Sequence, residues 1–175
     1  ITKELLICHA ISKITKDTWN KYNGWELVLK IIEFKFNEYT GDTLILDINK
    51  IWNIKGFDAI IGNPPYNKGG GNGGSKKLWN YFVMYSLENL NKYGYLLYVH
   101  PPGWRKPHHP TNKIYDLMKS YNMIYLNILS EKESNDIFKC STRADYYLLQ
   151  KTKYKKNTII SNSEGEFDCN IEDWP

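Results

Sequence analysis

The residues with the clearest potential for chemistry are four in a row: Asn63, Pro64, Pro65 and Tyr66. The Asn63 amide can donate and accept hydrogen bonds, and the Tyr66 ring offers a flat apolar face. Because each proline fixes its own φ angle, the Asn63 side chain and the Pro64 carbonyl can be held in fixed positions. These two groups can accept two hydrogen bonds from an exocyclic amino group while the ring stacks on the attached base. A tight turn alone would explain less, since one turn residue is enough to end a strand.

The elements around this tetrad follow from the hydrophobic pattern. The segment FDAIIG, residues 57–62, directly precedes the tetrad and predicts a fully buried strand. The segment KGGGNGGS, residues 68–75, predicts a loop, because so many glycines cannot support regular structure. Further strands are predicted over 42–48, 95–99, 123–129 and 144–151, and helices over 3–19, 25–36, 78–90 and 114–121.

Helices that alternate with apolar strands predict an α/β fold with an open, mainly parallel sheet. Ligands of such sheets gather at the carboxyl ends of the strands, which is where the tetrad lies. The strand over 144–151 is expected as a hairpin-like return and therefore as a final antiparallel strand. With 175 residues, 42% of them hydrophobic, the chain is long enough for one domain with its own core.

Charge and cysteine content restrict the function less. A net charge of +4 and a pI of about 8.8 permit contact with a polyanion without requiring it. Three cysteines, widely spaced and odd in number, fit a reducing cytoplasm better than a disulfide framework. No segment predicts a membrane span. The chain begins with Ile1 instead of methionine, so we expect it to be a piece of a longer chain.

The segment FDAIIGNPPYN, residues 57–67, resembles the Asn-Pro-Pro-Tyr motif of S-adenosylmethionine-dependent amino-methyltransferases. The resemblance is greatest to the adenine-N6 DNA methyltransferases of type II and IIG restriction-modification enzymes, and it covers about residues 40 to 151. It implies a Rossmann-like class I methyltransferase sheet, mainly parallel with a final antiparallel strand. Related motifs occur in methyltransferases of ribosomal RNA and of protein glutamine. The glutamine enzymes usually follow the motif with a short aliphatic step instead of a glycine-rich loop.

The resemblance implies catalytic roles for the tetrad, residues Asn63, Pro64, Pro65 and Tyr66. Asn63 Oδ1 and the Pro64 carbonyl would accept hydrogen bonds from the N6 amino group of an adenine. These bonds would favour the positive charge that develops on the nitrogen as it attacks the methyl group.

Binding roles follow from the same resemblance. Tyr66 and Phe138 would bind the substrate by stacking on the flipped adenine. A place for Phe138 in the core is an equal alternative, because aromatic side chains are usually buried for packing. Asp42 and Thr43 would bind the cofactor through its adenine, and the alternative for Asp42 is a plain turn residue.

Other polar side chains near the tetrad have simpler interpretations. Contacts with phosphate groups are conceivable for Lys68, Lys76, Lys77, Arg105 and Lys106, although a solvated surface is the ordinary reading of any single one. We predict no metal site, because no cysteine or carboxylate stands at metal spacing beside His100, His108 and His109.

The sequence therefore predicts a site-specific DNA methyltransferase of a restriction-modification system, with S-adenosyl-L-methionine as cofactor. Its expected partner is double-stranded DNA, with no membrane partner, and the full-length protein is expected to be a cytoplasmic monomer. The alternatives are an RNA or protein-glutamine N-methyltransferase, or a nucleic-acid-binding relic without catalysis.

Two parts of the family pattern are missing from the chain. Residues 1–175 contain neither the glycine-rich cofactor loop nor the acidic residue that holds the ribose, so the first strands of the sheet are expected to be absent. We therefore expect residues 1–155 to be a partial catalytic domain, and residues 156–175 to be a tail or the start of a following region. Such a piece alone is expected to bind cofactor weakly or not at all and to be inactive.

Overall fold

The computed structural model describes residues 3–33, 37–67, 77–106, 113–139, 142–153 and 156–170. The chain divides into two compact units, residues 1–41 and residues 42–175. Several positions of the sequence analysis lie outside the described residues, namely the glycine-rich segment 68–75 with Lys68, and Lys76, His108 and His109.

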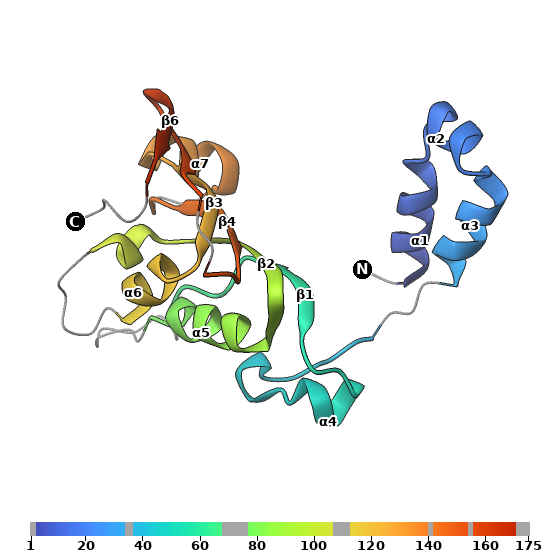
Figure 1. The fold of residues 1–175 in the computed structure, drawn as a ribbon, viewed down its shortest axis with the longest axis horizontal. Helices are drawn as coiled ribbons and strands as arrows, with labels where there is room; N and C mark the ends of the chain where they lie inside the picture. Colours follow the sequence, from blue (N-terminus) through green and yellow to red (C-terminus); the bar gives the residue numbers. More distant parts are fainter. Residues whose placement is uncertain are drawn as a thin grey trace. The chain divides into compact units, whose positions relative to one another are not determined.

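The described residues of the first unit form three helices, α1 (Lys3–Ser12), α2 (Lys16–Lys21) and α3 (Gly24–Ile32) (Figure 1). The single helix predicted over 3–19 is therefore interrupted. The interruption has a local cause, because the Thr15 side chain accepts a hydrogen bond from the Thr18 backbone N–H at 3.1 Å and starts a new helix there.

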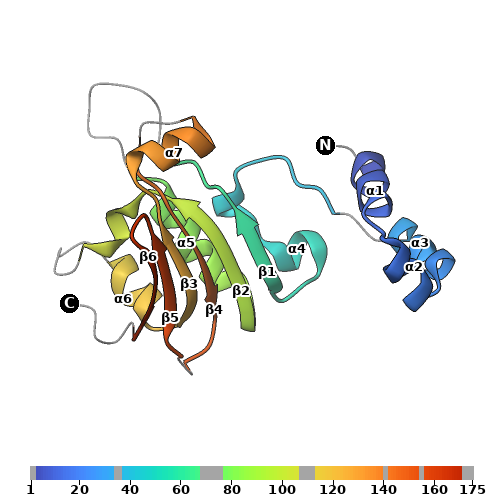
Figure 2. The same ribbon diagram turned by 90° about the horizontal axis from the view of Figure 1, so that it is seen from above.

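In the part of the second unit that the structure describes, the strands form a six-stranded sheet in the order β1-β2-β4-β3-β5-β6 (Figure 2). The strands are β1 (Phe57–Gly62), β2 (Leu90–His100), β3 (Asn122–Ile128), β4 (Asp145–Gln150), β5 (Thr158–Asn162) and β6 (Gly165–Cys169). Strands β1, β2, β3 and β5 run in one direction, while β4 and β6 run in the opposite direction. The predicted α/β class is confirmed, and the strand predicted over 144–151 is antiparallel, as β4 between β2 and β3. It is not the final strand, because β5 and β6 follow it.

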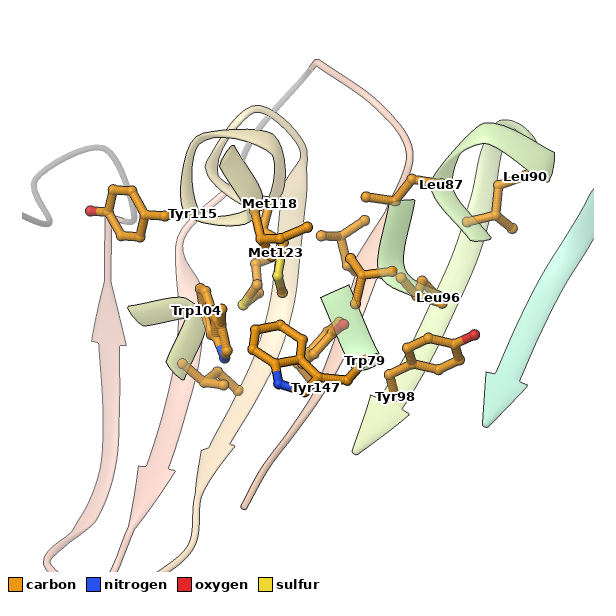
Figure 3. Packing of buried hydrophobic residues seen from close by; sticks show 14 residues of the cluster. Trp79, Leu87, Leu90, Leu96, Tyr98, Trp104, Tyr115, Met118, Met123 and Tyr147 are labelled. Carbon is orange, nitrogen blue, oxygen red and sulfur yellow. The ribbon is translucent and has the colours of Figure 1, made fainter. Parts of the chain in front are cut away.

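The helices of this unit are η1 (Thr43–Ile45), α4 (Ile48–Trp52), α5 (Trp79–Asn89), η2 (Pro102–Arg105), α6 (Lys113–Lys119) and α7 (Glu131–Phe138). Helices α5 and α6 pack on one face of the sheet and close the hydrophobic core (Figures 2 and 3). The strands contribute Leu96, Tyr98, Met123, Leu126, Tyr147 and Leu149 to this core. None of the described helices is both long and apolar enough to cross a membrane.

The strand predicted over 42–48 is wrong. The segment instead forms η1 and the start of α4, because two aspartates cap its backbone. Asp42 Oδ1 accepts a hydrogen bond from the Leu44 N–H at 3.0 Å. Asp47 Oδ1 accepts from the N–H groups of Asn49 and Lys50 at 3.1 and 3.0 Å. Side chains of this kind stabilise turns and helix starts in competition with a strand.

The prediction that the strand 57–62 is fully buried is also wrong. In the described sheet β1 pairs with β2 on one side, and the Ile61 side chain is 75% exposed. The apolar composition correctly marked a strand, but full burial needs neighbours on both sides and cover on both faces.

The division of the chain at residue 155 stays a prediction. Within the range 156–175, β5 and β6 form a hairpin, and β5 pairs in parallel with β3. The strands predicted near 95–99, 123–129 and 144–151 are confirmed as β2, β3 and β4, with β2 extending in both directions.

Candidate functional site

The tetrad begins directly after β1, at the carboxyl end of a strand that runs parallel to β2. Asn63 and Pro65 are exposed, Pro64 is buried and Tyr66 is half-buried. The preceding Gly62 has no room for a side chain, because a Cβ there would lie 2.9 Å from the Tyr98 ring on β2. The close packing of β1 on β2 and the buried ring of Pro64 therefore anchor a turn that presents the Asn63 amide to solvent.

The described residues on the two sides of segment 68–76 are bonded to each other. The Tyr66 carbonyl accepts a hydrogen bond from the Leu78 N–H at 3.0 Å, and Asn67 and Lys77 form an antiparallel bridge. Since Leu78 immediately precedes α5, the backbone of Tyr66 is tied to the start of that helix. The tetrad is thus held at one end by β1 and at the other by α5.

The end of β2 beside the tetrad carries a packed aromatic cluster. The Trp79 ring stacks on the His100 ring with centroids 4.4 Å apart. His100 Nδ1 lies 3.0 Å from the Pro101 carbonyl, which can only accept, so Nδ1 carries the proton. His100 Nε2 then accepts from the Tyr147 hydroxyl at 3.1 Å. Burial lowers the pKa of His100 to about 4, so the ring is neutral at pH 7.

A few residues after His100, Arg105 on η2 forms an ion pair with Asp145. Asp145 on β4 accepts two hydrogen bonds from Arg105, at 2.7 and 3.2 Å, and a third from the Trp104 indole N–H at 2.9 Å. Burial raises the pKa of Asp145, and the bonds from Arg105 and Trp104 act in the opposite direction. Arg105, a candidate for phosphate contact, therefore has a carboxylate partner, while Lys77 and Lys106 are exposed.

Phe138 is the last residue of α7 and is 36% exposed, so it is not part of the buried core. The helix starts in a capping box, in which the Ser130 hydroxyl accepts from the Glu133 N–H and the Glu133 carboxylate accepts from the Ser130 N–H. From α7 the chain returns to the start of β4, which pairs with the end of β2. Phe138 thus lies in the connection between β3 and β4. Strand β4 begins beside the end of β2, at the same end of the sheet as the start of the tetrad.

Asp42 and Thr43 lie on a different segment, at the start of η1, and both are exposed. This segment is tied to α5, because the Tyr85 hydroxyl donates a hydrogen bond to the Leu46 carbonyl at 2.9 Å. Helix α5 is therefore connected to both segments: Leu78, just before the helix, bonds to Tyr66 of the tetrad, and Tyr85 in the helix bonds to Leu46, a few residues after Asp42 and Thr43.

The sequence analysis missed the contributions of Asp145 and Tyr147. Both lie in an apolar segment that reads simply as a strand, and their partners are 40 to 47 residues away in the chain. No local spacing connects such residues. The one available signal was a carboxylate at the start of an apolar strand, which a turn residue would explain equally well.

Three solved structures that share this fold are subunits of restriction-modification systems or a putative methyltransferase. The methyltransferase subunit of a type I restriction-modification system from Streptococcus thermophilus matches with a TM-score of 0.57 and 16% identity, covering 87% of this chain and 38% of that one. A modification subunit of a putative type I restriction enzyme from Vibrio vulnificus matches with a TM-score of 0.52 and 13% identity over 70% and 28%. A putative class I S-adenosylmethionine-dependent methyltransferase from Listeria monocytogenes matches with a TM-score of 0.51 and 15% identity over 79% and 45%. The chain thus has a methyltransferase fold and spans less than half the length of these proteins.

The family is identified by sequence. The family model of the Eco57I restriction-modification methylase matches residues 1–138, and the chain belongs to this family. No curated protein matches the chain. The resemblance to the methyltransferases of restriction-modification systems is confirmed.

Proposed function

We propose that the protein is a site-specific DNA methyltransferase that acts on the N6 amino group of an adenine flipped out of double-stranded DNA. It would supply the modification activity of a restriction-modification system in the cytoplasm. The observation that carries the proposal is the tetrad itself, anchored by the buried Pro64 and presenting Asn63 at the carboxyl end of β1 in a chain of this family.

The tetrad has the groups that this reaction needs. Asn63 Oδ1 and the Pro64 carbonyl accept hydrogen bonds from the two N6 hydrogens, which directs the nitrogen lone pair away from them. The same bonds stabilise the positive charge that develops on the nitrogen in the transition state. Because the turn is anchored on both sides, these acceptors are positioned before the substrate arrives.

The flipped base needs a surface to replace the stack that it leaves. Flipping costs about a few kcal/mol, and stacking on an aromatic ring recovers about 1–3 kcal/mol per base. Tyr66 is half-buried and Phe138 is exposed, so part of each residue can be reached by a substrate, and the Tyr66 backbone is held by its hydrogen bond from Leu78. They are the proposed walls of the base pocket.

S-adenosyl-L-methionine is the proposed cofactor, and its chemical contribution is a methyl group bound to an electron-poor sulfonium. Asp42 and Thr43 would hold its adenine moiety. The fit to these residues is good, since Asp42 is exposed and its Oδ1 is fixed by the Leu44 N–H. A carboxylate held in this way accepts a hydrogen bond from an amino group.

The test is methyl transfer by the full-length protein that contains this sequence, with labelled cofactor and adenine-containing duplex DNA. We expect label in N6-methyladenine and a loss of about 100-fold or more in kcat for Asn63→Ala, the scale for removing one transition-state hydrogen bond. Asn157→Ala removes an exposed asparagine at the far end of the sheet and serves as the matched control. Transfer to RNA or to protein glutamine in preference to DNA would contradict the proposed substrate. Full activity of the Asn63 variant would contradict the proposed role of the tetrad.

A further inference from the structure

The Asp145 carboxylate is fully buried, yet its contacts are expected to add little to the free energy of unfolding. It accepts hydrogen bonds from Trp104 and Arg105, which follow the end of β2, and the Arg105 side chain is 31% exposed. Replacing a buried ion pair by packed apolar residues is often neutral or stabilising, because desolvation offsets much of the attraction. A positional role accounts better for a charge at this place.

On one side, these contacts lead to the tetrad. Trp104 and Arg105 belong to η2, and the Trp104 ring lies beside the Tyr147 ring, with centroids 6.2 Å apart. The Tyr147 ring meets the His100 ring edge-on at 5.3 Å, and His100 stacks on Trp79 at 4.4 Å. The N–H of Leu78, next to Trp79, donates to the Tyr66 carbonyl. A displacement of η2 would therefore reach Tyr66 through packed atoms and one hydrogen bond.

On the other side, they lead to α7. Ala144 immediately precedes Asp145, and its N–H donates to the buried Ser134 hydroxyl at 3.1 Å. The Ala144 carbonyl accepts from the Leu129 N–H at 3.0 Å, just before α7 begins. Ser134 lies in the middle of α7, whose last residue is Phe138. The start of β4 is thus bonded to the helix that carries the second proposed wall.

We propose that Asp145 is a positioning residue that sets the separation of Tyr66 and Phe138, the two walls of the base pocket. This inference rests on the proposed function. Asp145 contacts neither wall directly and is not a catalytic residue. It fixes η2 against the start of β4, so the segments behind both rings share one rigid support. A misplacement of about 1 Å in such a pocket can lower a rate on the order of 100-fold.

The test compares Asp145→Asn with Thr158→Val in the full-length protein. Asp145→Asn keeps the shape of the side chain but turns an amide toward donors that need an acceptor. Thr158 is equally buried and donates to the Met123 carbonyl at 2.7 Å, so its variant also loses a buried hydrogen bond, but far from the pocket. Both variants are expected to melt at lower temperature than the wild type.

The kinetic readouts separate position from stability. With duplex DNA, we expect Asp145→Asn to lose about 10-fold to 100-fold in kcat, with the KM for the cofactor changed less than about twofold. In a duplex with 2-aminopurine in place of the target adenine, the 2-aminopurine fluorescence should be at least twofold weaker with Asp145→Asn than with the wild type. The reason is that the base is held less often in the flipped state. Thr158→Val should match the wild type in both measurements.

Arg105→Lys provides a second variant if Asp145→Asn does not fold, since it keeps the charge and gives up the two-bond geometry. We expect Arg105→Lys to lose less kcat and less 2-aminopurine fluorescence than Asp145→Asn. Wild-type values for both Asp145→Asn and Arg105→Lys would overturn the inference, as would equal losses in Thr158→Val. Absence of transfer in the wild type would instead overturn the proposed function.

Discussion

The two faces of the sheet differ in burial, although the side chains that point to each face are similarly apolar. On the face covered by α5 and α6, Leu96 and Leu149 are fully buried. On the opposite face, Leu97 is 38% exposed and Ile61 is 75% exposed, and the two are cross-strand partners. Leu96 and Leu97 are consecutive and of the same type, so the difference comes entirely from what covers each face.

This contrast teaches what an apolar run in a strand can indicate. A run without alternation is typical of strands that are buried on both faces, which is why 57–62 was predicted as fully buried. Residue type defines which side chains can be buried, whereas the partner elements decide which of them are. The two faces are therefore expected to differ in their contribution to stability as well.

The largest effect is expected on the covered face. Leu96→Ala removes a fully buried side chain and leaves a cavity under α5, so we expect a loss of about 2–5 kcal/mol in the free energy of unfolding. Urea denaturation with a constant m-value would measure it. Leu97→Ala is the matched control, with an expected loss of less than about 1 kcal/mol. Equal losses would mean that the two faces are equally covered in solution.

The second effect concerns pH and the covered face at His100. Burial lowers the pKa of His100 to about 4 from an unfolded value of 6.5, so the unfolded state takes up the proton first as the pH falls. The resulting stability is fully present above pH 6.5 and is lost between there and pH 4, by about 3 kcal/mol in total.

Unfolding curves of the wild type and of His100→Gln over this pH range would isolate that contribution. Asp145 titrates with the opposite sign, because its pKa is raised by burial, but it is present in both proteins and cancels in the difference. Parallel pH profiles for the two proteins would show that His100 is accessible to protons in the folded state.

A smaller effect is expected from two tyrosine hydroxyls on opposite faces of β2. The Tyr98 hydroxyl forms a buried 2.6 Å hydrogen bond with Ser86, whereas the Tyr95 hydroxyl accepts from the exposed Gln150 amide at 3.1 Å. Tyr98→Phe leaves the Ser86 hydroxyl unpaired and should cost about 1–3 kcal/mol. Tyr95→Phe should change stability by less than about 0.5 kcal/mol. A reversed order in thermal denaturation would contradict the assignment of the faces.

The smallest effect is expected at Ile61, an exposed position of β1. Ile61→Thr keeps a β-branched side chain and removes apolar surface that is 75% exposed, so stability should change by less than about 0.5 kcal/mol. Light scattering at high concentration should show less self-association, because the apolar edge is reduced. A loss of several kcal/mol would show that the Ile61 side chain is buried in solution.

The sequence predicted β1, β2, β3 and β4 and the place of the tetrad, because apolar runs and Asn-Pro-Pro-Tyr are local signals, but it did not predict β5 and β6. It failed at 42–48, where the caps of Asp42 and Asp47 outweigh an apolar pattern. It also could not indicate Asp145, whose partners on η2 are brought near only by the pairing of β2 with β4. Long-range pairing is a property of the whole fold, and no spacing rule records it.

The inner position of β4 has a consequence for synthesis of the protein. Strands β2 and β3 emerge from the ribosome before β4, but in the sheet they are joined only by β4, which lies between them and ends at Gln150. Until then both strands have open edges, and the support of Trp104 and Arg105 does not exist. The sheet therefore closes late during translation, and a nascent chain that stalls before residue 145 carries the complete Asn-Pro-Pro-Tyr motif without the strand that joins the two halves of its sheet.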